Sequence, residues 1–412
     1  MRPLQTSHDA DSPYAWTRLW VALALVTIGG AGMYSMAVVL PPLQVDFGIT
    51  RADASLPFTF TMIGFGLGGV LMGRLSDRFG VIVPVLLGSA SLGFGFITAS
   101  FSQNLLQFTV IHGLLIGFGT SGTFVPLVAD ITLWFTRRRG IAVAIVMSGN
   151  YLAGTVWPPL MQHFIDTAGW RATYTGTGLI CLFAMPLFAL ALRRKPPAIA
   201  GLAPPRAGAR GAPSNPERPL GFSPNQLQGL LCVSGIACCV AMSMPQVHMV
   251  AYCADLGFPA ARGAEMLALM MGFGILSRLA SGWIADRIGG LRTLLLGAVL
   301  QATALALFLP FDGLAALYVV SALFGLFQGG IVPSYPLIVR EYFSPREAGA
   351  RTGTVIMATL LGMAIGGWMP GWIFDMTGSY RAAFVNGIAW SMVTTGIALF
   401  LLYRVRWVPR EA

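Results

Sequence analysis

The stretch "GRLSDRFG", residues Gly73–Gly80, recurs 209 positions later as "GWIADRIG", residues Gly282–Gly289. A second pair repeats at nearly the same offset, "FIDTAGWRATY" from Phe164 and "IFDMTGSYRAAF" from Ile373. Self-similarity at one fixed spacing indicates a duplicated structural unit. The sequence therefore predicts two related halves, each carrying an Asp-Arg-x-Gly motif at an equivalent place.

The material between these repeats is strongly apolar. Of the 412 residues, 55% are hydrophobic and only 10% are charged, a composition typical of membrane proteins. Segments of about 18–25 apolar residues, each long enough to cross a bilayer as a helix, recur along the chain. They are 19–42, 57–73, 81–101, 105–129, 140–164, 172–192, 226–251, 263–285, 291–311, 315–338, 350–373 and 382–403.

These segments predict an all-α membrane protein with twelve transmembrane helices in two pseudo-symmetric six-helix bundles. We expect bundles over 19–192 and 226–403, with cytoplasmic tails at 1–18 and 404–412. Residues 193–225 are rich in proline and arginine, which favours a flexible basic cytoplasmic linker between the halves.

Basic residues follow the predicted topology. Of the 26 Lys and Arg residues, only Arg51, Arg171, Arg262 and Arg381 lie on the predicted outer side, and Arg278 lies within a span. The positive-inside rule then makes both termini cytoplasmic. The net charge of +10 follows this topology rather than a basic face for nucleic acid, which we do not expect as a partner. Short loops suit a multi-pass protein of the plasma membrane, as in a bacterial inner membrane.

Arg278 has no counterpart in the first half, where Gly69 stands 209 positions earlier. It lies eight residues before Asp286, so its Cα is roughly 12 Å inside the membrane from that loop. All 16 acidic residues fall in loops, tails or terminal turns, with Asp130 and Glu265 nearest to membrane depth. A buried guanidinium binds carboxylates well, so an anionic substrate is one expected partner. The alternatives are a structural arginine bound to backbone carbonyls, or one that reaches the headgroups.

The paired Asp-Arg-x-Gly loops, six-plus-six layout and basic linker resemble the major facilitator superfamily over essentially the whole chain. The resemblance implies two bundles that rock about a central site lined by helices 1, 4, 7 and 10. The two loops would form a conformational latch through Gly73, Asp77, Arg78 and Gly80, and through Gly282, Asp286 and Arg287. The other interpretation of these charges is simple topological placement.

The arginine on the eighth helix and the stretch "WFTRRRGIAVAIVMSG", Trp134–Gly149, resemble the monocarboxylate-transporter and oxalate–formate antiporter branch. The resemblance implies that Arg278 binds the substrate carboxylate. Two departures matter: Gly274 stands where animal members of the branch have an aspartate, and the eleventh helix lacks the lysine of the oxalate transporter. One cation favours a monoanion.

Polar residues within the apolar spans complete the predicted substrate site. They are Tyr34, Thr120, Asn150, Tyr151, Gln328 and Tyr335. For each of them helix packing is an equally good interpretation. His112 and His248 titrate in the right range for a proton relay, although a histidine in a helix often serves packing instead.

The sequence lacks the motifs of a membrane-embedded enzyme, and we expect neither catalysis nor a metal or other cofactor. It predicts a monomeric secondary transporter of small organic monoanions, surrounded by lipid, working by proton symport or anion exchange. The alternative is a transporter of a larger aromatic or drug-like solute.

Overall fold

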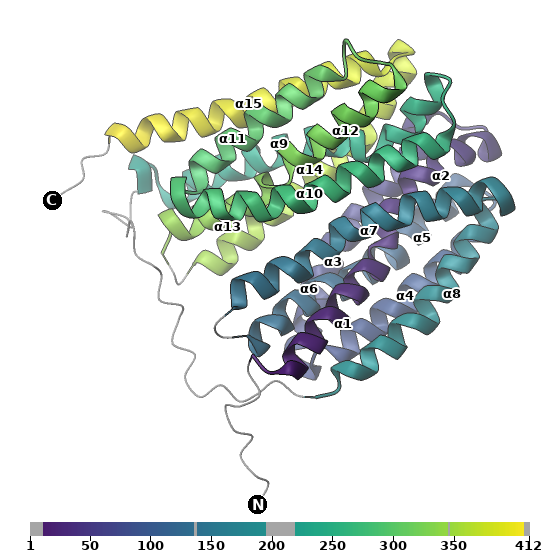
Figure 1. The fold of residues 1–412 in the computed structure, drawn as a ribbon, viewed down its shortest axis with the longest axis horizontal. Coiled ribbons are helices and arrows are strands. Elements are labelled where there is room, and N and C mark those ends of the chain that lie inside the picture. Colours follow the sequence, from purple (N-terminus) through teal and green to yellow (C-terminus); the bar gives the residue numbers. More distant parts are fainter. Residues whose placement is uncertain (1–10, 136–137, 195–218, 345–346, 408–412) are drawn as a thin grey trace, which may run out of the picture. The chain divides into compact units, whose positions relative to one another are not determined.

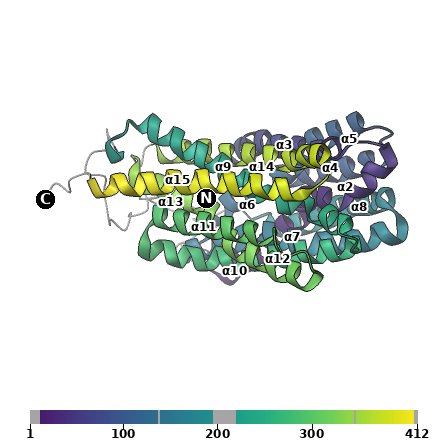
Figure 2. The ribbon, with the colours of Figure 1, turned by 90° about the horizontal axis from the view of Figure 1, so that it is seen from above.

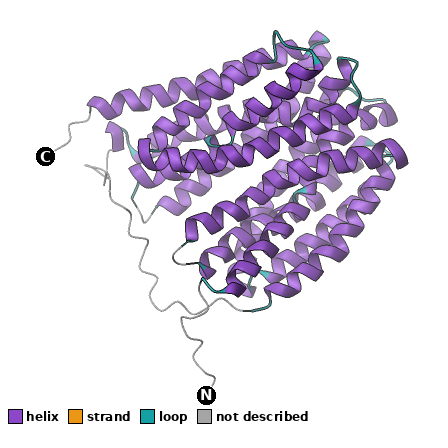
Figure 3. Ribbon diagram, in the orientation of Figure 1, coloured by secondary structure: helices purple, strands orange, loops and turns teal. Residues whose placement is uncertain are grey.

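The computed structural model describes residues 11–135, 138–194, 219–344 and 347–407. Its contacts divide the chain into two compact units, Met1–Pro205 (unit 1) and Arg206–Ala412 (unit 2). In the ranges described, the regular secondary structure is helical, and short loops join successive helices (Figure 3).

Unit 1 is a bundle of helices that run alongside one another, from purple to teal in Figure 1. Within it α4 packs along α8, and α3 packs on α6. Its elements are α1 (Pro13–Gly29), α2 (Ala31–Phe47), α3 (Arg51–Phe79), α4 (Ile82–Ser100), α5 (Leu105–Ile111), the π-helix η2 (His112–Gly117), α6 (Phe118–Trp134), α7 (Arg139–Ala168), α8 (Trp170–Ala189) and the 3₁₀-helix η3 (Leu190–Leu192).

Unit 2 has the same kind of bundle, which Figure 2 shows from above in green to yellow. Here α9 packs along α14 and α15, and α10 packs along α12. Its elements are the 3₁₀-helix η4 (Pro219–Gly221), α9 (Pro224–Asp255), α10 (Ala260–Ile288), α11 (Gly290–Leu307), α12 (Leu314–Gln328), α13 (Ile331–Tyr342), α14 (Ala348–Thr377) and α15 (Tyr380–Trp407).

The prediction of twelve membrane-spanning helices is confirmed. The described part of the chain holds 12 helical segments that are long and apolar enough to cross a membrane, and six fall in each unit. Some spans join two or three of the elements named above: the first is Pro13–Phe47, the fourth Leu105–Trp134 and the tenth Leu314–Tyr342. The protein is therefore an all-α, multi-pass membrane protein.

Three helices extend beyond the predicted boundaries of the tails and the linker. The first helix begins at Pro13, inside the expected tail, because the Ser12 side chain caps it by accepting from the Ala15 N–H. The helix α9 begins at Pro224, inside the expected linker, because Ser223 and Gln226 form a capping box. The last helix continues to Trp407 rather than ending at 403. Most of the expected linker, 195–218, lies outside the residues described.

Three spans are interrupted inside the bundles, where a regular helix would be expected. The first is broken at Gly30, between α1 and α2, and the tenth at Gly329-Gly330, between α12 and α13. The fourth contains the π-helix η2, a form of helix that is frequent at functional sites. These are three of the four helices expected to line the central site.

Both Asp-Arg-x-Gly motifs end a long helix in the same way. The helix α3 ends at Phe79, and Gly80 follows with a φ of 81°; α10 ends at Ile288, and Gly289 follows with a φ of 86°. Residues with a Cβ rarely adopt these angles, which accounts for a glycine at the turn in each half. The repeat therefore encodes a shared helix–turn–helix geometry.

Candidate substrate-binding site

Arg278 lies within α10, half-buried and ten residues from the end of the helix at Ile288. The turn that carries it packs on the break in the tenth span. A Cβ on Gly329 would lie 2.6 Å from the Gly274 carbonyl oxygen and 2.7 Å from the Ser277 Cβ. The absence of a side chain at Gly329 thus lets the break contact the residues that immediately precede Arg278.

Gln328 is the last residue of α12, directly before the break, and its side chain is fully buried. Its Oε1 accepts a hydrogen bond of 3.1 Å from Nε2 of Gln246 on α9. Its own Nε2 is buried and has no hydrogen-bond partner among the residues described. Sequence reasoning missed Gln246, although an amide in the apolar stretch Met242–Val250 was a usable signal.

Tyr335, on α13, belongs to the packed core of unit 2. Its hydroxyl lies 3.0 Å from the Ser234 Oγ and 3.4 Å from the Cys238 Sγ, both on α9. These contacts join α13 to α9. They show how the Tyr335 side chain is held, and its role as a substrate ligand stays a prediction.

The predicted site residues of unit 1 gather near the interruptions of the first and fourth spans. Tyr34 is buried on α2, four residues after Gly30, and Thr120 is buried on α6, three residues after the end of η2. The two helices are in close contact, because a Cβ on Gly32 would lie 2.3 Å from the Thr120 Oγ1. The Thr120 hydroxyl donates its proton to the Ile116 carbonyl over 2.8 Å. Its oxygen can therefore only accept a hydrogen bond from a further partner.

Asn150 and Tyr151 lie side by side in the sequence of α7, where Asn150 is half-buried and Tyr151 is buried. The helix α7 packs closely on α1 and α2, and a Cβ on Gly30 would lie 2.3 Å from the Ala153 Cβ. The structure thus brings together, within unit 1, the helices that carry Tyr34 and this pair.

His112 is fully buried at the start of η2, and both of its ring nitrogens have neutral partners. Its Nδ1 lies 3.1 Å from the Thr61 Oγ1, and its Nε2 lies 3.2 Å from the Tyr174 hydroxyl. Thr61 already donates its proton to the Pro57 carbonyl, so it accepts from Nδ1. The Tyr174 hydroxyl lies against Nε2 and is also 3.9 Å from the Met36 Sδ.

His248 on α9 has a similar environment in unit 2. Its Nε2 lies 2.8 Å from the Gly367 carbonyl oxygen, which can only accept, so Nε2 carries the proton. Its Nδ1 lies 2.8 Å from the Tyr380 hydroxyl. A role of either histidine as a proton relay stays a prediction, and these contacts show how each ring is held.

The Asp-Arg pairs of the two motifs are exposed on the ends of α3 and α10. Asp77 and Arg78 are exposed in unit 1, as are Asp286 and Arg287 in unit 2, where the guanidinium lies 3.4 Å from the ring centre of Trp283. Gly73 and Gly282 have open space or ordinary contacts where a Cβ would lie. Whether these residues latch one unit to the other stays a prediction.

A buried ion pair, which sequence reasoning missed, ties together three helices of unit 1. Arg18 of α1, 1% exposed, donates from Nε and Nη2 to the two carboxylate oxygens of Asp130 on α6, over 2.7 and 2.8 Å. Its Nη1 donates to the carbonyl oxygens of Leu192 and Arg194, beyond the end of α8, over 3.0 and 3.2 Å. Such a bidentate, fully desolvated pair fixes the ends of the three helices against each other.

Glu265, the acidic residue of unit 2 predicted to lie nearest to membrane depth, also has partners within its own unit. Glu265, near the start of α10, pairs with Arg262 over 3.0 Å and accepts from the Tyr318 hydroxyl. The two acids nearest to membrane depth therefore form ion pairs with Arg18 and Arg262.

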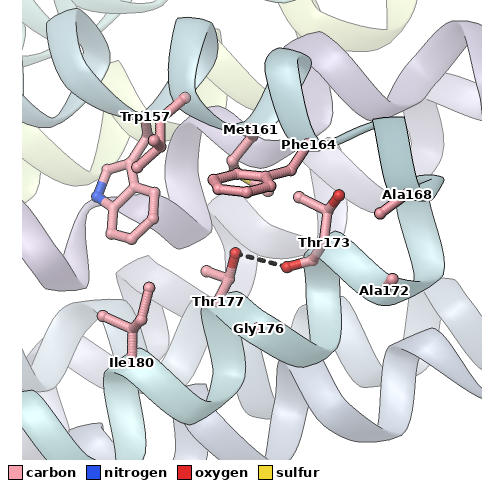
Figure 4. Close-up of a pocket in the computed structure, with 10 residues that line it drawn as sticks. Trp157, Met161, Phe164, Ala168, Ala172, Thr173, Gly176, Thr177 and Ile180 are labelled. Carbon is pink, nitrogen blue, oxygen red and sulfur yellow. Dashed lines mark hydrogen bonds between the residues drawn. The ribbon is translucent and has the colours of Figure 1, made fainter. Parts of the chain in front are cut away.

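A cavity of about 190 Å³ lies between α7 and α8 in unit 1. Figure 4 shows Trp157, Met161 and Phe164 of α7 facing Thr173 and Thr177 of α8. Both threonine hydroxyls donate to carbonyls of their own helix, at Gly169 and Thr173, so the cavity wall is apolar. None of the predicted substrate-site residues lines this cavity. In the part of the chain that the structure describes, no three His, Cys, Asp or Glu side chains are grouped for a metal ion.

Known proteins resemble this chain in both sequence and fold. Monocarboxylate transporter 13 of Bos taurus is 26% identical over 81% of this chain and 76% of its own. Monocarboxylate transporter 11 of Homo sapiens is 25% identical, and the match covers 96% of this chain and 84% of its own. The MFS-type transporter opdF of Penicillium oxalicum is 28% identical, and the match covers 81% of this chain and 77% of its own. These relatives agree with the resemblance to the monocarboxylate-transporter branch.

Among solved structures, a bacterial homolog of the human lysosomal transporter Spinster has the same fold, with a TM-score of 0.73. It is 14% identical, and the similarity covers 97% of this chain and all of that one. The family model of the Major Facilitator Superfamily matches residues 21–314 and 276–412. This chain therefore belongs to the Major Facilitator Superfamily and is a membrane transporter, not an enzyme.

Proposed function

We propose that the protein is a secondary active transporter of small organic monoanions, in which Arg278 binds the substrate carboxylate. The observation that carries the proposal is the position of Arg278, inside a membrane-spanning helix and on the turn that packs against the break of the tenth span. A planar guanidinium matches a carboxylate in a two-point fork, and one such cation suits one negative charge. The names of the monocarboxylate-transporter relatives support the same substrate class.

The interrupted helices support this site on independent grounds. Transporters commonly form their substrate sites from discontinuous helices, because the break exposes backbone groups and leaves room for a ligand. Here the breaks at Gly30 and Gly329-Gly330 and the π-helix η2 fall in the first, tenth and fourth spans. Tyr34, Thr120, Asn150, Tyr151, Gln328 and Tyr335 remain the candidate polar residues of the site.

Transport in this scheme proceeds by alternating access, with the two Asp-Arg-x-Gly turns latching one state. The latch consists of Gly73, Asp77, Arg78 and Gly80 with Gly282, Asp286 and Arg287. The asymmetry of basic residues supports a cytoplasmic location for both termini, and the short connections suit a bacterial inner membrane. We expect the transporter to work as a monomer.

Coupling follows one of two routes. In symport, the proton enters with the substrate at Arg278 or passes through His112 or His248; in exchange, one anion leaves as another enters. Uptake into proteoliposomes with and without preloaded anion separates the two routes, because only exchange requires an internal anion. His112→Gln and His248→Gln variants then test the relay, since glutamine keeps a donor and an acceptor but does not titrate. Loss of gradient-driven uptake in one of them identifies that ring as the proton carrier.

The test of the substrate class is uptake of radiolabelled pyruvate, lactate and propionate by the purified, reconstituted protein under an imposed pH gradient. We expect Arg278→Ala to abolish uptake and Arg262→Ala to retain it. Arg262 is the matched control, because it is an arginine of the same helix whose side chain is exposed and paired with Glu265. Uptake that Arg278→Ala leaves unchanged would contradict the proposal and favour a larger aromatic or drug-like solute.

A further inference from the structure

Gln246 and Gln328 form an amide pair that joins α9 to α12 inside unit 2. Gln328 is fully buried and Gln246 is 7% exposed, and the Gln246 Nε2 donates to the Gln328 Oε1 over 3.1 Å. A glutamine amide has two N–H donors and one carbonyl acceptor. The hydrogen bond therefore occupies the acceptor of Gln328 and leaves its two donors for another partner.

The amide nitrogen of Gln328 is left without a partner by this pairing. Its Nε2 is buried and has no hydrogen-bond partner in the described part of the chain. Buried polar groups nearly always have partners, because an unsatisfied donor in a low-dielectric interior is costly. An oxygen atom of a bound solute would satisfy this donor.

The position of the pair relates it to Arg278. Gln328 directly precedes Gly329, and Gly329 is in close contact with Gly274 and Ser277 of α10. The donor, Gln328 Nε2, thus belongs to the residue directly before the break. Gly329, within the break, packs on the turn of α10 that carries Arg278. The break therefore follows a neutral donor and packs on the turn of α10 that carries a cation.

We propose that the Gln246–Gln328 pair determines specificity: Gln246 orients Gln328, whose Nε2 donates to an oxygen of the substrate other than the carboxylate. This inference rests on the proposed function, and it adds a preference within the monocarboxylates. The protein selects an acid with a carbonyl oxygen on the carbon next to the carboxylate over the acid of the same carbon skeleton without it. A donor that is built into the site and left unsatisfied disfavours the analogue lacking an acceptor.

The test compares substrates in matched pairs, pyruvate with propionate and phenylpyruvate with 3-phenylpropionate, by competition and by direct uptake into proteoliposomes. The wild-type protein is expected to favour the 2-oxo member of at least one pair. Gln328→Met, which keeps the length of the side chain but removes the donor, should lower that preference by about tenfold, the effect of one hydrogen bond. A single symmetric peak in size-exclusion chromatography and a Tm close to that of the wild type show, independently of uptake, that this variant folds.

Two further variants separate a role in specificity from a role in packing. Gln246→Met leaves the Gln328 amide in place but removes the hydrogen bond that orients it, so the preference should fall by a smaller factor. Gln301→Met is the matched control, because Gln301 is a fully buried amide of α11 whose Nε2 donates to the Cys238 carbonyl. The control should keep the full preference for the 2-oxo acid.

The outcomes distinguish this inference from the proposed function. If uptake depends on Arg278 but Gln328→Met lowers both members of a pair equally, the amide pair serves packing alone and the inference is wrong. If the wild-type protein takes up none of the four acids, or Arg278→Ala leaves their uptake unchanged, the proposed function fails and the inference with it.

Discussion

The ion pair of Arg18 and Asp130 allows a sharp prediction about the stability of unit 1. Arg18→Met preserves most of the apolar stem but removes every hydrogen bond of the guanidinium, and it leaves the Asp130 carboxylate buried without its two donors. Breaking a buried pair by removing one partner costs about 3–5 kcal/mol. For a unit of this size, that loss corresponds to a fall in Tm of about 6–20 °C.

Thermal unfolding of the purified protein in detergent, followed by intrinsic fluorescence, measures this fall. The control is Arg262→Met, because the pair of Arg262 and Glu265 is half-exposed and such pairs contribute at most about 1 kcal/mol. The double variant Arg18→Met/Asp130→Leu removes the uncompensated charge and should be more stable than Arg18→Met alone. A Tm of Arg18→Met within 2 °C of the wild type, or a double variant no more stable than the single one, would show that the ion pair does not stabilise unit 1 in this way.

Two other predictions concern packing and the latch. A Cβ on Gly366 would lie 2.4 Å from the Val240 carbonyl oxygen, so Gly366→Leu should separate α14 from α9 and lower the yield of folded protein in size-exclusion chromatography, whereas Gly396→Leu, with open space around it, should not. Asp77→Asn and Asp286→Asn should lower the maximal uptake rate with little change in KM, because the latch acts on the conformational step. An effect on KM alone would contradict the latch.

The twelve spans and the equivalence of the two halves could be predicted from sequence because hydropathy and the repeat report on them directly. The exact helix ends could not, since Ser12 and the Ser223–Gln226 capping box act through local hydrogen bonds that a hydropathy window ignores. Hydropathy places a residue at a depth in the membrane but does not give the direction of its side chain. For this reason the contacts of Tyr335 with Ser234 and Cys238 could not be predicted from its place in the tenth span.

The contacts that matter most join residues far apart in the chain. In the sequence, Arg18 looks like one of the basic residues that mark the cytoplasmic side, because its partner Asp130 is 112 positions away. Gln246 could not be identified as a site residue from the sequence alone, because what marks it is its hydrogen bond to Gln328, 82 positions further on. Pairings of this kind arise from the tertiary arrangement of helices, and a single sequence gives their members but not their partners.

The proposed function depends above all on the guanidinium of Arg278 binding the carboxylate of the substrate. Its most direct test is the equilibrium binding of pyruvate to the purified protein, measured by isothermal titration calorimetry for the wild type, Arg278→Lys and Arg278→Ala, with Arg262→Ala as control. We predict weakened binding for Arg278→Lys, because an ammonium cannot form the two-point fork, and no detectable binding for Arg278→Ala. Equal affinity of the wild type and Arg278→Ala for pyruvate would contradict this role of Arg278.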